Sequence, residues 1–290
     1  MAVRSGFRGS GGNTTVDEKA RKDLVESLLP VVRAAGAAIL AHRRTPLPFR
    51  FKNDASPVTV ADLESEAIIR RTCAGLFPAI RLVSEEDASS YEAGIPSTCL
   101  LVDPLDGTKE FISGREDFTV NIALIENGAP SAGIIFAPAL DRMFFTSGSG
   151  KLVVMDHEDT REILGGVVAD QRAQPLILTS RSHLDPHTAE VVKHLQSTNV
   201  RQVGSSLKFA LIAAGEADLY LRLAPTMVWD SAAGQALIEA AGGVVLRPDG
   251  IRLPYLAEMK NEGFVAACTI SLAERVLMLI RSLRNTGPPD

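Results

Sequence analysis

The sequence contains few cysteines and no excess of positive charge, and each shortage counts against a class of protein. Its three cysteines, Cys73, Cys99 and Cys268, are far apart and form no CxxC motif, which argues against a redox dithiol or a zinc knuckle. Reduced thiols in a cytosolic protein are the usual state of such cysteines. The net charge of −5 argues against binding to a nucleic acid polymer, which requires a basic face.

Long apolar runs are missing as well. No stretch approaches the roughly 18 apolar residues that a membrane-spanning helix needs, so we expect no transmembrane segment. Residues 1–16 contain two arginines with no apolar run after them, and we expect a flexible tail there instead of a signal peptide. The hydrophobic content of 46% in 290 residues is ordinary for a globular protein and sufficient for a large core.

Two helices are expected near the start of the chain. Residues 17–43 repeat apolar side chains at spacings of three and four, which predicts a helix. Within it, Pro30 should either introduce a kink or mark a late start of the helix. Residues 61–77 predict a second amphipathic helix. Between them, residues 45–60 are rich in Pro, Asn and Asp, which is typical of a loop or an irregular hairpin.

The remaining pattern predicts strands first and then an alternation of strands and helices. Residues 78–155 form short β-branched runs, with Asn-Gly at 127–128 as a hairpin turn. The second half predicts strands at 175–180, 200–203, 217–221 and 243–247, and helices at 187–197, 206–215 and 230–241. This indicates a layered α/β (α+β) fold. We place one subdomain at 17–157, with the site, and a second at 158–290 that completes it.

Acidic residues recur where the predicted strands end or helices begin. They are Asp62, Glu85, Glu86, Asp103, Asp106 and Asp230. Taken singly, each is more commonly a cap or a turn residue than a ligand. Taken together, carboxylates without His or Cys favour a hard cation such as Mg²⁺, with Mn²⁺ as an alternative.

The segment VDPLDGT concentrates this chemistry. Asp103 and Asp106 are bent towards each other by Pro104 and Gly107, so they would bracket two ions of the kind that assist phosphoryl transfer. Free N–H groups at the start of a helical turn after Gly107 would bind phosphate oxygens, and the Thr108 hydroxyl would orient a water. An exposed turn is the competing interpretation. We interpret the segment as the metal site of a phosphatase.

Several segments together resemble the inositol monophosphatase superfamily of Mg²⁺-dependent, lithium-sensitive phosphatases. They are SPVTVADLESEAII, SEED, LLVDPLDGTKEFISGREDFTVNIALIENGAP and APTMVWDSAAGQALIEAAGGVV, in the family's order over residues 20–280. DGTKEF and GSSLKFALIAAGEADLY are similar to the 3′(2′),5′-bisphosphate nucleotidases of that superfamily. The resemblance implies an αβαβα sandwich.

The resemblance also implies metal ligands. Glu85, Asp103 and the carbonyl of Leu105 would hold the ion that activates the attacking water. Asp103, Asp106 and Asp230 would hold a second ion beside the leaving oxygen. A third, weaker ion is implied near the glutamates, so two or three Mg²⁺ ions are expected.

Further roles follow from the same resemblance. Thr108, hydrogen-bonded to Asp62, would orient the water and help to accept its proton, with Glu85 counted among the catalytic residues. The N–H groups of Gly107 and Thr108 would bind the phosphate. Glu86 would assist the third ion through water.

Substrate contacts are expected from two parts of the chain. The expected substrate-binding set is Leu105, Asp106, Gly107, Thr108, Ser206, Lys208 and Asp230. Lys208 would pair with a 5′-phosphate, although a solvated lysine on a Ser-capped amphipathic helix is the alternative. Lys109 and Arg115 are either further phosphate contacts or surface charges, and residues 181–183 form a polar loop that would lie near a nucleotide.

The implied reaction is hydrolysis of the 3′-phosphate of 3′-phosphoadenosine 5′-phosphate to AMP and phosphate. 3′-Phosphoadenylyl sulfate would be a second substrate, which ties the enzyme to sulfate assimilation. Two alternatives stay open: an inositol- or sugar-phosphate phosphatase, and a non-catalytic metal- or nucleotide-binding regulator. We expect a cytoplasmic monomer or homodimer, with a peripheral contact at the inner face of a membrane left open.

Overall fold

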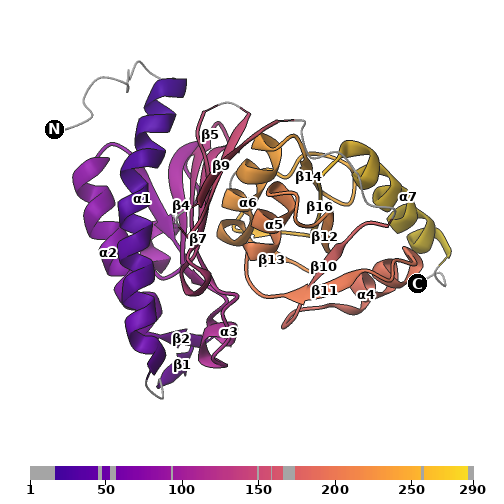
Figure 1. The fold of residues 1–290 in the computed structure, drawn as a ribbon, viewed down its shortest axis with the longest axis horizontal. Helices are drawn as coiled ribbons and strands as arrows, with labels where there is room; N and C mark the ends of the chain where they lie inside the picture. Colours follow the sequence, from indigo (N-terminus) through magenta and orange to yellow (C-terminus); the bar gives the residue numbers. More distant parts are fainter. Residues whose placement is uncertain are drawn as a thin grey trace.

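Five layers, alternating between helices and sheets, make up the computed structural model (Figure 1). The structure describes residues 17–44, 48–52, 57–92, 94–148, 150–157, 159–165, 174–255 and 258–286. The predicted tail, residues 1–16, lies outside them. The observed layers confirm the αβαβα expectation.

The first two layers are a helix pair and a large sheet. The helices are α1 (Glu18–Ala41) and α2 (Val60–Leu76). The seven strands run in sequence order across the sheet: β3 (Arg81–Ser84), β4 (Thr98–Asp106), β5 (Thr119–Glu126), β6 (Ala129–Ala137), β7 (Arg142–Thr146), β8 (Lys151–Asp156) and β9 (Asp159–Leu164). Strands β3 and β4 are parallel and the other pairs are antiparallel. Strand β9 of this sheet lies beyond residue 157, where we placed the boundary between two subdomains. The division into two subdomains stays a prediction.

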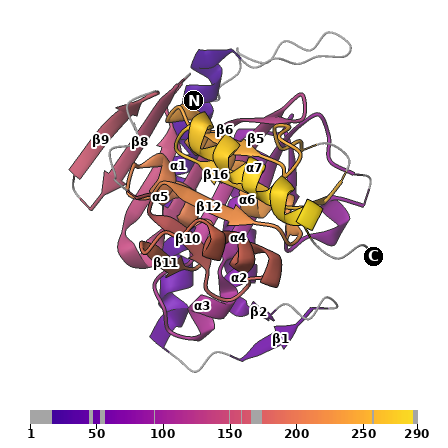
Figure 2. The ribbon, with the colours of Figure 1, turned by 90° about the vertical axis from the view of Figure 1, so that its right-hand side faces the viewer.

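The other three layers come from the second half of the chain. A central layer of α5 (Leu207–Ala213) and α6 (Val228–Ala240) separates the two sheets, and α4 (Pro186–His194) and α7 (Ile270–Thr286) form the outer layer, where α7 lies across the smaller sheet (Figure 2). That sheet has the order β11 (Val200–Val203), β10 (Ile177–Ser180), β12 (Leu219–Arg222), β16 (Phe264–Ala267) and β14 (Val244–Leu246).

Short elements complete the fold around the site. They are the pairs β1 (Phe49–Phe51) with β2 (Pro57–Thr59) and β13 (Thr226–Met227) with β15 (Lys260–Asn261), the helix α3 (Thr108–Ile112), and the 3₁₀ turns His42–Arg44, Ala88–Ser90 and Pro138–Leu140. The β1–β2 pair and α3 lie together at one end of the molecule (Figures 1 and 2).

Helix α1 differs from expectation at Pro30. The helix starts at Glu18, after Asp17 accepts a hydrogen bond from the Ala20 N–H at 2.7 Å, and it includes Pro30, so the predicted late start is wrong. Pro30 is exposed, so the missing N–H lies on the solvent side, where helices tolerate a lost bond.

Helix α1 also differs from the sequence-based expectation about membranes. Among the described residues it is the one helix that is long and apolar enough to span a membrane by length and composition, whereas no such segment was expected. Its apolar side chains, such as Leu24, Leu28 and Val32, are buried in the core against the large sheet. In this fold, α1 is therefore a core helix.

Strand β4 is buried on both faces, which makes it the centre of the structure. Leu100 and Val102 belong to the core under α1 and α2, while Cys99 and Leu101 belong to the core shared with α6. The alternation follows from the two-residue period of a strand. The predicted turn that follows the next strand is also confirmed, because Asn127 and Gly128 have φ values of 52° and 74°, as a tight hairpin requires.

Helix α6 lies unusually close to the large sheet. A Cβ atom added to Gly133 of β6 would come within 2.6 Å of the Ala233 carbonyl oxygen and 3.0 Å of the Ala236 Cβ. Only a glycine allows this approach, which brings the middle of α6 against β6.

Gly133→Ala should therefore destabilise the protein by about 1–3 kcal/mol, because the overpacked helix must move. Gly75→Ala is the matched control: nothing lies within 4 Å of its added Cβ in α2, so we expect a gain of about 0.5–1 kcal/mol. Urea unfolding measures both. Equal stability of Gly133→Ala and the wild type would show that the close approach is not required.

Candidate active site

The two aspartates of VDPLDGT face the same way because β4 contains a bulge. Asp103 pairs with Asn121 and Asp106 with Thr119 on β5, so three steps along β4 match two along β5. In a regular strand, residues three apart point to opposite faces. The extra residue returns Asp106 to the face of Asp103, and both line one cavity of about 440 Å³.

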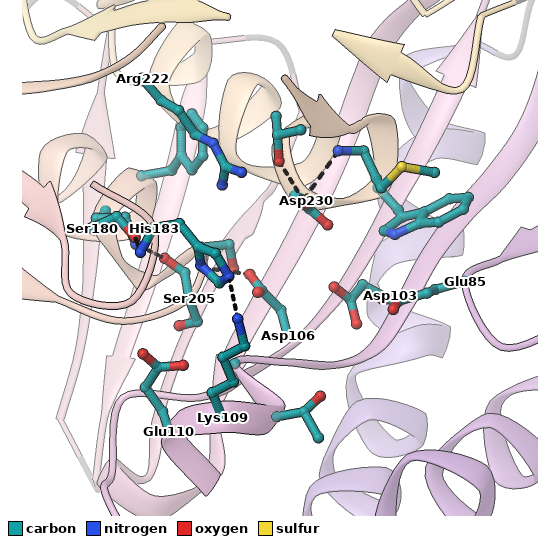
Figure 3. A pocket seen from close by; sticks show the side chains of 18 of the residues that line it. Glu85, Asp103, Asp106, Lys109, Glu110, Ser180, His183, Ser205, Arg222 and Asp230 are labelled. Carbon is teal, nitrogen blue, oxygen red and sulfur yellow. Dashed lines mark hydrogen bonds between the residues drawn. The ribbon is translucent and has the colours of Figure 1, made fainter. Parts of the chain in front are cut away.

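Carboxylates from three elements meet at one end of this cavity. Glu85 follows β3, Asp103 lies on β4 and Asp230 lies in the first turn of α6, and one carboxylate oxygen of each lies within 4.8 Å of the others (Figure 3). Asp106 lines the same cavity. This is an all-oxygen donor set of the kind that Mg²⁺ and Mn²⁺ prefer, so the residues fit the implied metal.

The electrostatics of the cluster point to the same requirement. Burial raises the pKa of Asp103, Asp106 and Asp230, and repulsion from neighbouring carboxylates adds to the shift of each. Ionising all of them together costs free energy unless a cation neutralises them.

Lys52 supplies one positive charge at the edge of the cluster. Its Nζ lies 2.6 Å from Oε1 of Glu85 and 2.6 Å from Oε1 of Glu86. Burial, together with repulsion from Glu85, raises the pKa of Glu86 to about 7. Lys52 was not singled out in the sequence, where it lies 33 residues from Glu85.

The implied contact between Thr108 and Asp62 is present. Thr108 Oγ1 lies 3.0 Å from Asp62 Oδ1 and 3.2 Å from the Leu105 carbonyl oxygen, so either can accept its hydrogen. Asp62 is held by the N–H and hydroxyl of Thr59, at 2.7 and 2.6 Å. The lone pairs of Thr108 Oγ1 are left to accept a hydrogen bond in the cavity, which Thr108 lines.

Gly107 lies where the chain turns from β4 into α3. Its φ of 92° is unfavourable for other residues, and an added Cβ would come within 3.3 Å of the Asp117 carbonyl oxygen and of Phe118. Both Gly107 and Thr108 line the cavity beside the carboxylates. The predicted phosphate-binding turn thus lies next to the predicted metal ligands.

Lysine and arginine side chains, together with one histidine, line the opposite end of the cavity. Burial and the neighbouring positive charges lower the pKa of His183 to about 4, so its imidazole is neutral near pH 7. Lys109, His183, Lys208 and Arg222 come from four separate elements or loops (Figure 3 labels Lys109, His183 and Arg222). Lys109 Nζ lies 2.8 Å from His183 Nε2. The Nε of Arg222 is buried and makes no hydrogen bond among the described residues, whereas its Nη2 donates to the Pro225 carbonyl at 2.9 Å.

Lys208 and Ser206 do not have the surface roles of the alternative interpretation. Every residue of α5 is buried, so the amphipathic helix with a solvated lysine is wrong. Lys208 Nζ donates to the carbonyls of Val203 and Ser205 at 3.1 and 2.5 Å, and the Ser206 side chain makes no cap hydrogen bond. Instead, the Ser206 N–H donates to Asp106 at 2.5 Å.

The remaining candidates from the sequence differ in whether they line the cavity. Lys109 lines it, whereas Arg115 is exposed and does not. Arg222 and Lys260, which also line it, were missed. The signal for Arg222 was its place at the end of a predicted strand, which is too common to distinguish it from a surface arginine.

An all-carboxylate cluster beside the predicted phosphate-binding turn, in a layered αβαβα fold, is the arrangement of a metal-dependent phosphatase. The chain belongs to the inositol monophosphatase family, because the model of that family matches residues 21–284.

Curated relatives within the family refine this assignment. One named 3′(2′),5′-bisphosphate nucleotidase CysQ, from Salmonella typhimurium, is 41% identical over 83% of this chain and 98% of its own. The protein of that name from Escherichia coli K12 is 39% identical over the same shares. The predicted resemblance to this group of the family is therefore confirmed.

Solved structures agree with the fold. CysQ from Bacteroides thetaiotaomicron is 29% identical, with a TM-score of 0.69 over 85% of this chain and 98% of that one. An IMPase of Thermotoga maritima is 21% identical, with a TM-score of 0.76 over 91% of this chain and 98% of that one. The second comparison supports the fold alone.

Mg²⁺ should raise the thermal midpoint of protein stripped with EDTA, because it binds the folded carboxylate cluster. At an Mg²⁺ concentration of about 100 times Kd, the expected gain is about 2.7 kcal/mol. Asp103→Asn should be more stable than the wild type without metal and should lose most of the Mg²⁺ response. Differential scanning fluorimetry measures both effects. Asp141→Asn, with an exposed side chain at 51%, is the control, and an equal Mg²⁺ response in both variants would contradict the metal assignment.

Proposed function

We propose that this protein is a Mg²⁺-dependent phosphatase that removes the 3′-phosphate of 3′-phosphoadenosine 5′-phosphate, giving AMP and phosphate. The observation that carries the proposal is the cavity with two ends of opposite charge. The carboxylate cluster lines one end, and Lys109, Lys208 and Arg222 line the other, together with a neutral His183 and the single carboxylate of Glu110. A substrate with two phosphates matches both ends, whereas a phosphate monoester matches one.

The carboxylate end would hold the metal. Glu85, Asp103 and the Leu105 carbonyl are proposed to hold one ion, and Asp106 and Asp230 to hold a second together with Asp103, with Mn²⁺ as an alternative to Mg²⁺. When bound, such ions polarise the phosphate ester and neutralise the charge that develops on its oxygens. Thr226 and the Met227 N–H hydrogen-bond the Asp230 carboxylate, which orients it towards the cavity.

Thr108 and Gly107 would position the reacting groups. The Thr108 hydroxyl accepts a hydrogen bond from the attacking water, which aligns an oxygen lone pair with phosphorus. Asp62, buried next to Thr108, takes the Thr108 hydrogen and receives the proton that passes from the water through this hydroxyl. The N–H groups of Gly107 and Thr108 bind oxygens of the phosphate that is removed.

The basic end would hold the second phosphate. A phosphate there would neutralise the positive charges of Arg222 and Lys109, which line the same cavity. The neutral imidazole of His183 would donate a hydrogen bond to it. 3′-Phosphoadenylyl sulfate carries the same 3′-phosphate and a longer anionic group at the 5′ position, so we propose it as a second substrate. This reaction belongs to sulfur assimilation.

A cytoplasmic location is part of the proposal. Its support is that Cys73 and Cys99 are buried and form no disulfide, as is usual in a reducing compartment.

Phosphate release should favour 3′-phosphoadenosine 5′-phosphate over inositol 1-phosphate by a kcat/KM ratio of about 100 or more, because a desolvated charged contact is worth several kcal/mol. Parallel assays with Mg²⁺, with and without Li⁺, measure this ratio and the expected lithium inhibition. EDTA should abolish both activities. A preference for inositol 1-phosphate would contradict the nucleotidase assignment and leave the metal site intact.

Arg222→Met should raise KM for the bisphosphate by about 10- to 100-fold, because an unpaired phosphate remains in the basic end. KM for inositol 1-phosphate should change by less than about twofold, since that substrate has no second phosphate. Arg201→Met, an exposed position on strand β11 of the same sheet, is the matched control. Equal losses with both substrates would show that Arg222 supports the fold of the site and not the second phosphate.

A further inference from the structure

Glu110 is a buried carboxylate that the proposed reaction does not use. Its exposed fraction is 4%, and it lines the basic end of the cavity, not the metal end (Figure 3). The side-chain partner of Glu110 among the described residues is a hydroxyl, that of Ser182, and not a cation in direct contact. Because a buried carboxylate is costly unless its surroundings compensate it, the contacts of Glu110 matter for its role.

The contacts of Glu110 place it under the wall of the cavity. Its Oε1 accepts a hydrogen bond from Ser182 Oγ at 2.6 Å. Its Cγ would lie 2.5 Å from a Cβ added to Gly204, so the side chain also stands against the backbone just before Ser205. The Glu110 side chain therefore supports two segments of the second half of the chain at once.

The residue before Glu110 contacts the same wall. Lys109 Nζ lies 2.8 Å from the Nε2 of His183, which directly follows Ser182. Both Lys109 and Glu110 belong to α3, the five-residue helix that begins immediately after Gly107. One short helix thus connects the proposed phosphate-binding turn to the Ser182–His183 segment, which forms the wall on the other side of the cavity.

The negative charge of Glu110 also affects the protonation of Lys208, which lines the same end of the cavity. Burial lowers the pKa of Lys208 to about 8, and the negative charges of Asp106 and Glu110 oppose this shift. Glu110 therefore helps to keep the Lys208 ammonium charged beneath the turn at Val203 and Ser205, whose carbonyls accept its hydrogen bonds.

We propose that Glu110 is a positioning residue for the second phosphate: it fixes the Ser182–His183 wall to the phosphate-binding turn and so sets the spacing between the two phosphate subsites. This inference rests on the proposed function, because the second subsite is defined by it. Glu110 acts through Ser182 and contacts neither the metal nor the reacting atoms. The expected consequence is selectivity for substrates whose two phosphates match that fixed spacing.

A double-mutant cycle on AMP binding tests the inference, with the Mg²⁺-loaded protein and calorimetry. AMP has only the phosphate that the basic end would take. Glu110→Ala and Ser182→Ala should each weaken AMP binding by about tenfold, and the double variant should be no weaker than either, because both remove one contact. Glu110→Gln should lose less than about threefold, since its amide oxygen still accepts from Ser182.

Kinetics with two substrates give the second readout. Glu110→Ala should raise KM for 3′-phosphoadenosine 5′-phosphate by about tenfold while KM for adenosine 3′-monophosphate stays within about twofold. Glu116→Ala, an exposed position in the loop after α3 with a side chain 59% exposed, should bind AMP as the wild type does.

The outcomes separate this inference from the function on which it rests. Additive effects of Glu110→Ala and Ser182→Ala on AMP binding, or equal losses with both substrates, would overturn the positioning role even if the wild type prefers the bisphosphate. A wild type that hydrolyses the bisphosphate no better than inositol 1-phosphate would overturn the proposed function. Coupled losses in AMP binding would then still support the link between Glu110 and the wall.

Discussion

The mutual repulsion of buried carboxylates is the constraint on which this structure depends. Asp103, Asp106 and Asp230 are drawn together from a strand and a helix, and burial raises the pKa of each. Such a cluster is tolerable only when cations balance it. The close approach of α6 to the large sheet at Gly133 and the bulge in β4 place charges at distances that a protein without a metal requirement would avoid.

The opposite charge at the other end of the cavity is the proposed source of its selectivity. The proposed metal ligands come from β4, from α6 and from the residue that follows β3, whereas Arg222 and His183 come from the smaller sheet and its loops. The five-residue helix α3 contacts both ends.

The sequence predicted the fold well where local rules dominate. The Asn-Gly turn and the strand at 200–203 are where they were expected, because turn chemistry and side-chain alternation act over a few residues. The late start predicted from Pro30 was wrong, because the free-energy cost of a proline in a helix depends on whether it lies on the solvent side. The last strand and the last helix, at 264–267 and 270–286, were not predicted from the local pattern. The family resemblance extended over residues 20–280 and implied the layered fold, but it did not give the bounds of these two elements.

By itself the sequence determined the family, the layered fold and the identity of the acidic residues, because these lie in short motifs such as VDPLDGT and WD. Only the tertiary structure decided how the charges are paired. Lys52 lies against Glu85, and Glu110 against Ser182, across 33 and 72 residues. Lys208, which looks like a surface lysine in the sequence, is buried. The physical reason is that burial and distance set the energy of a charge, and neither is a property of neighbours along the chain.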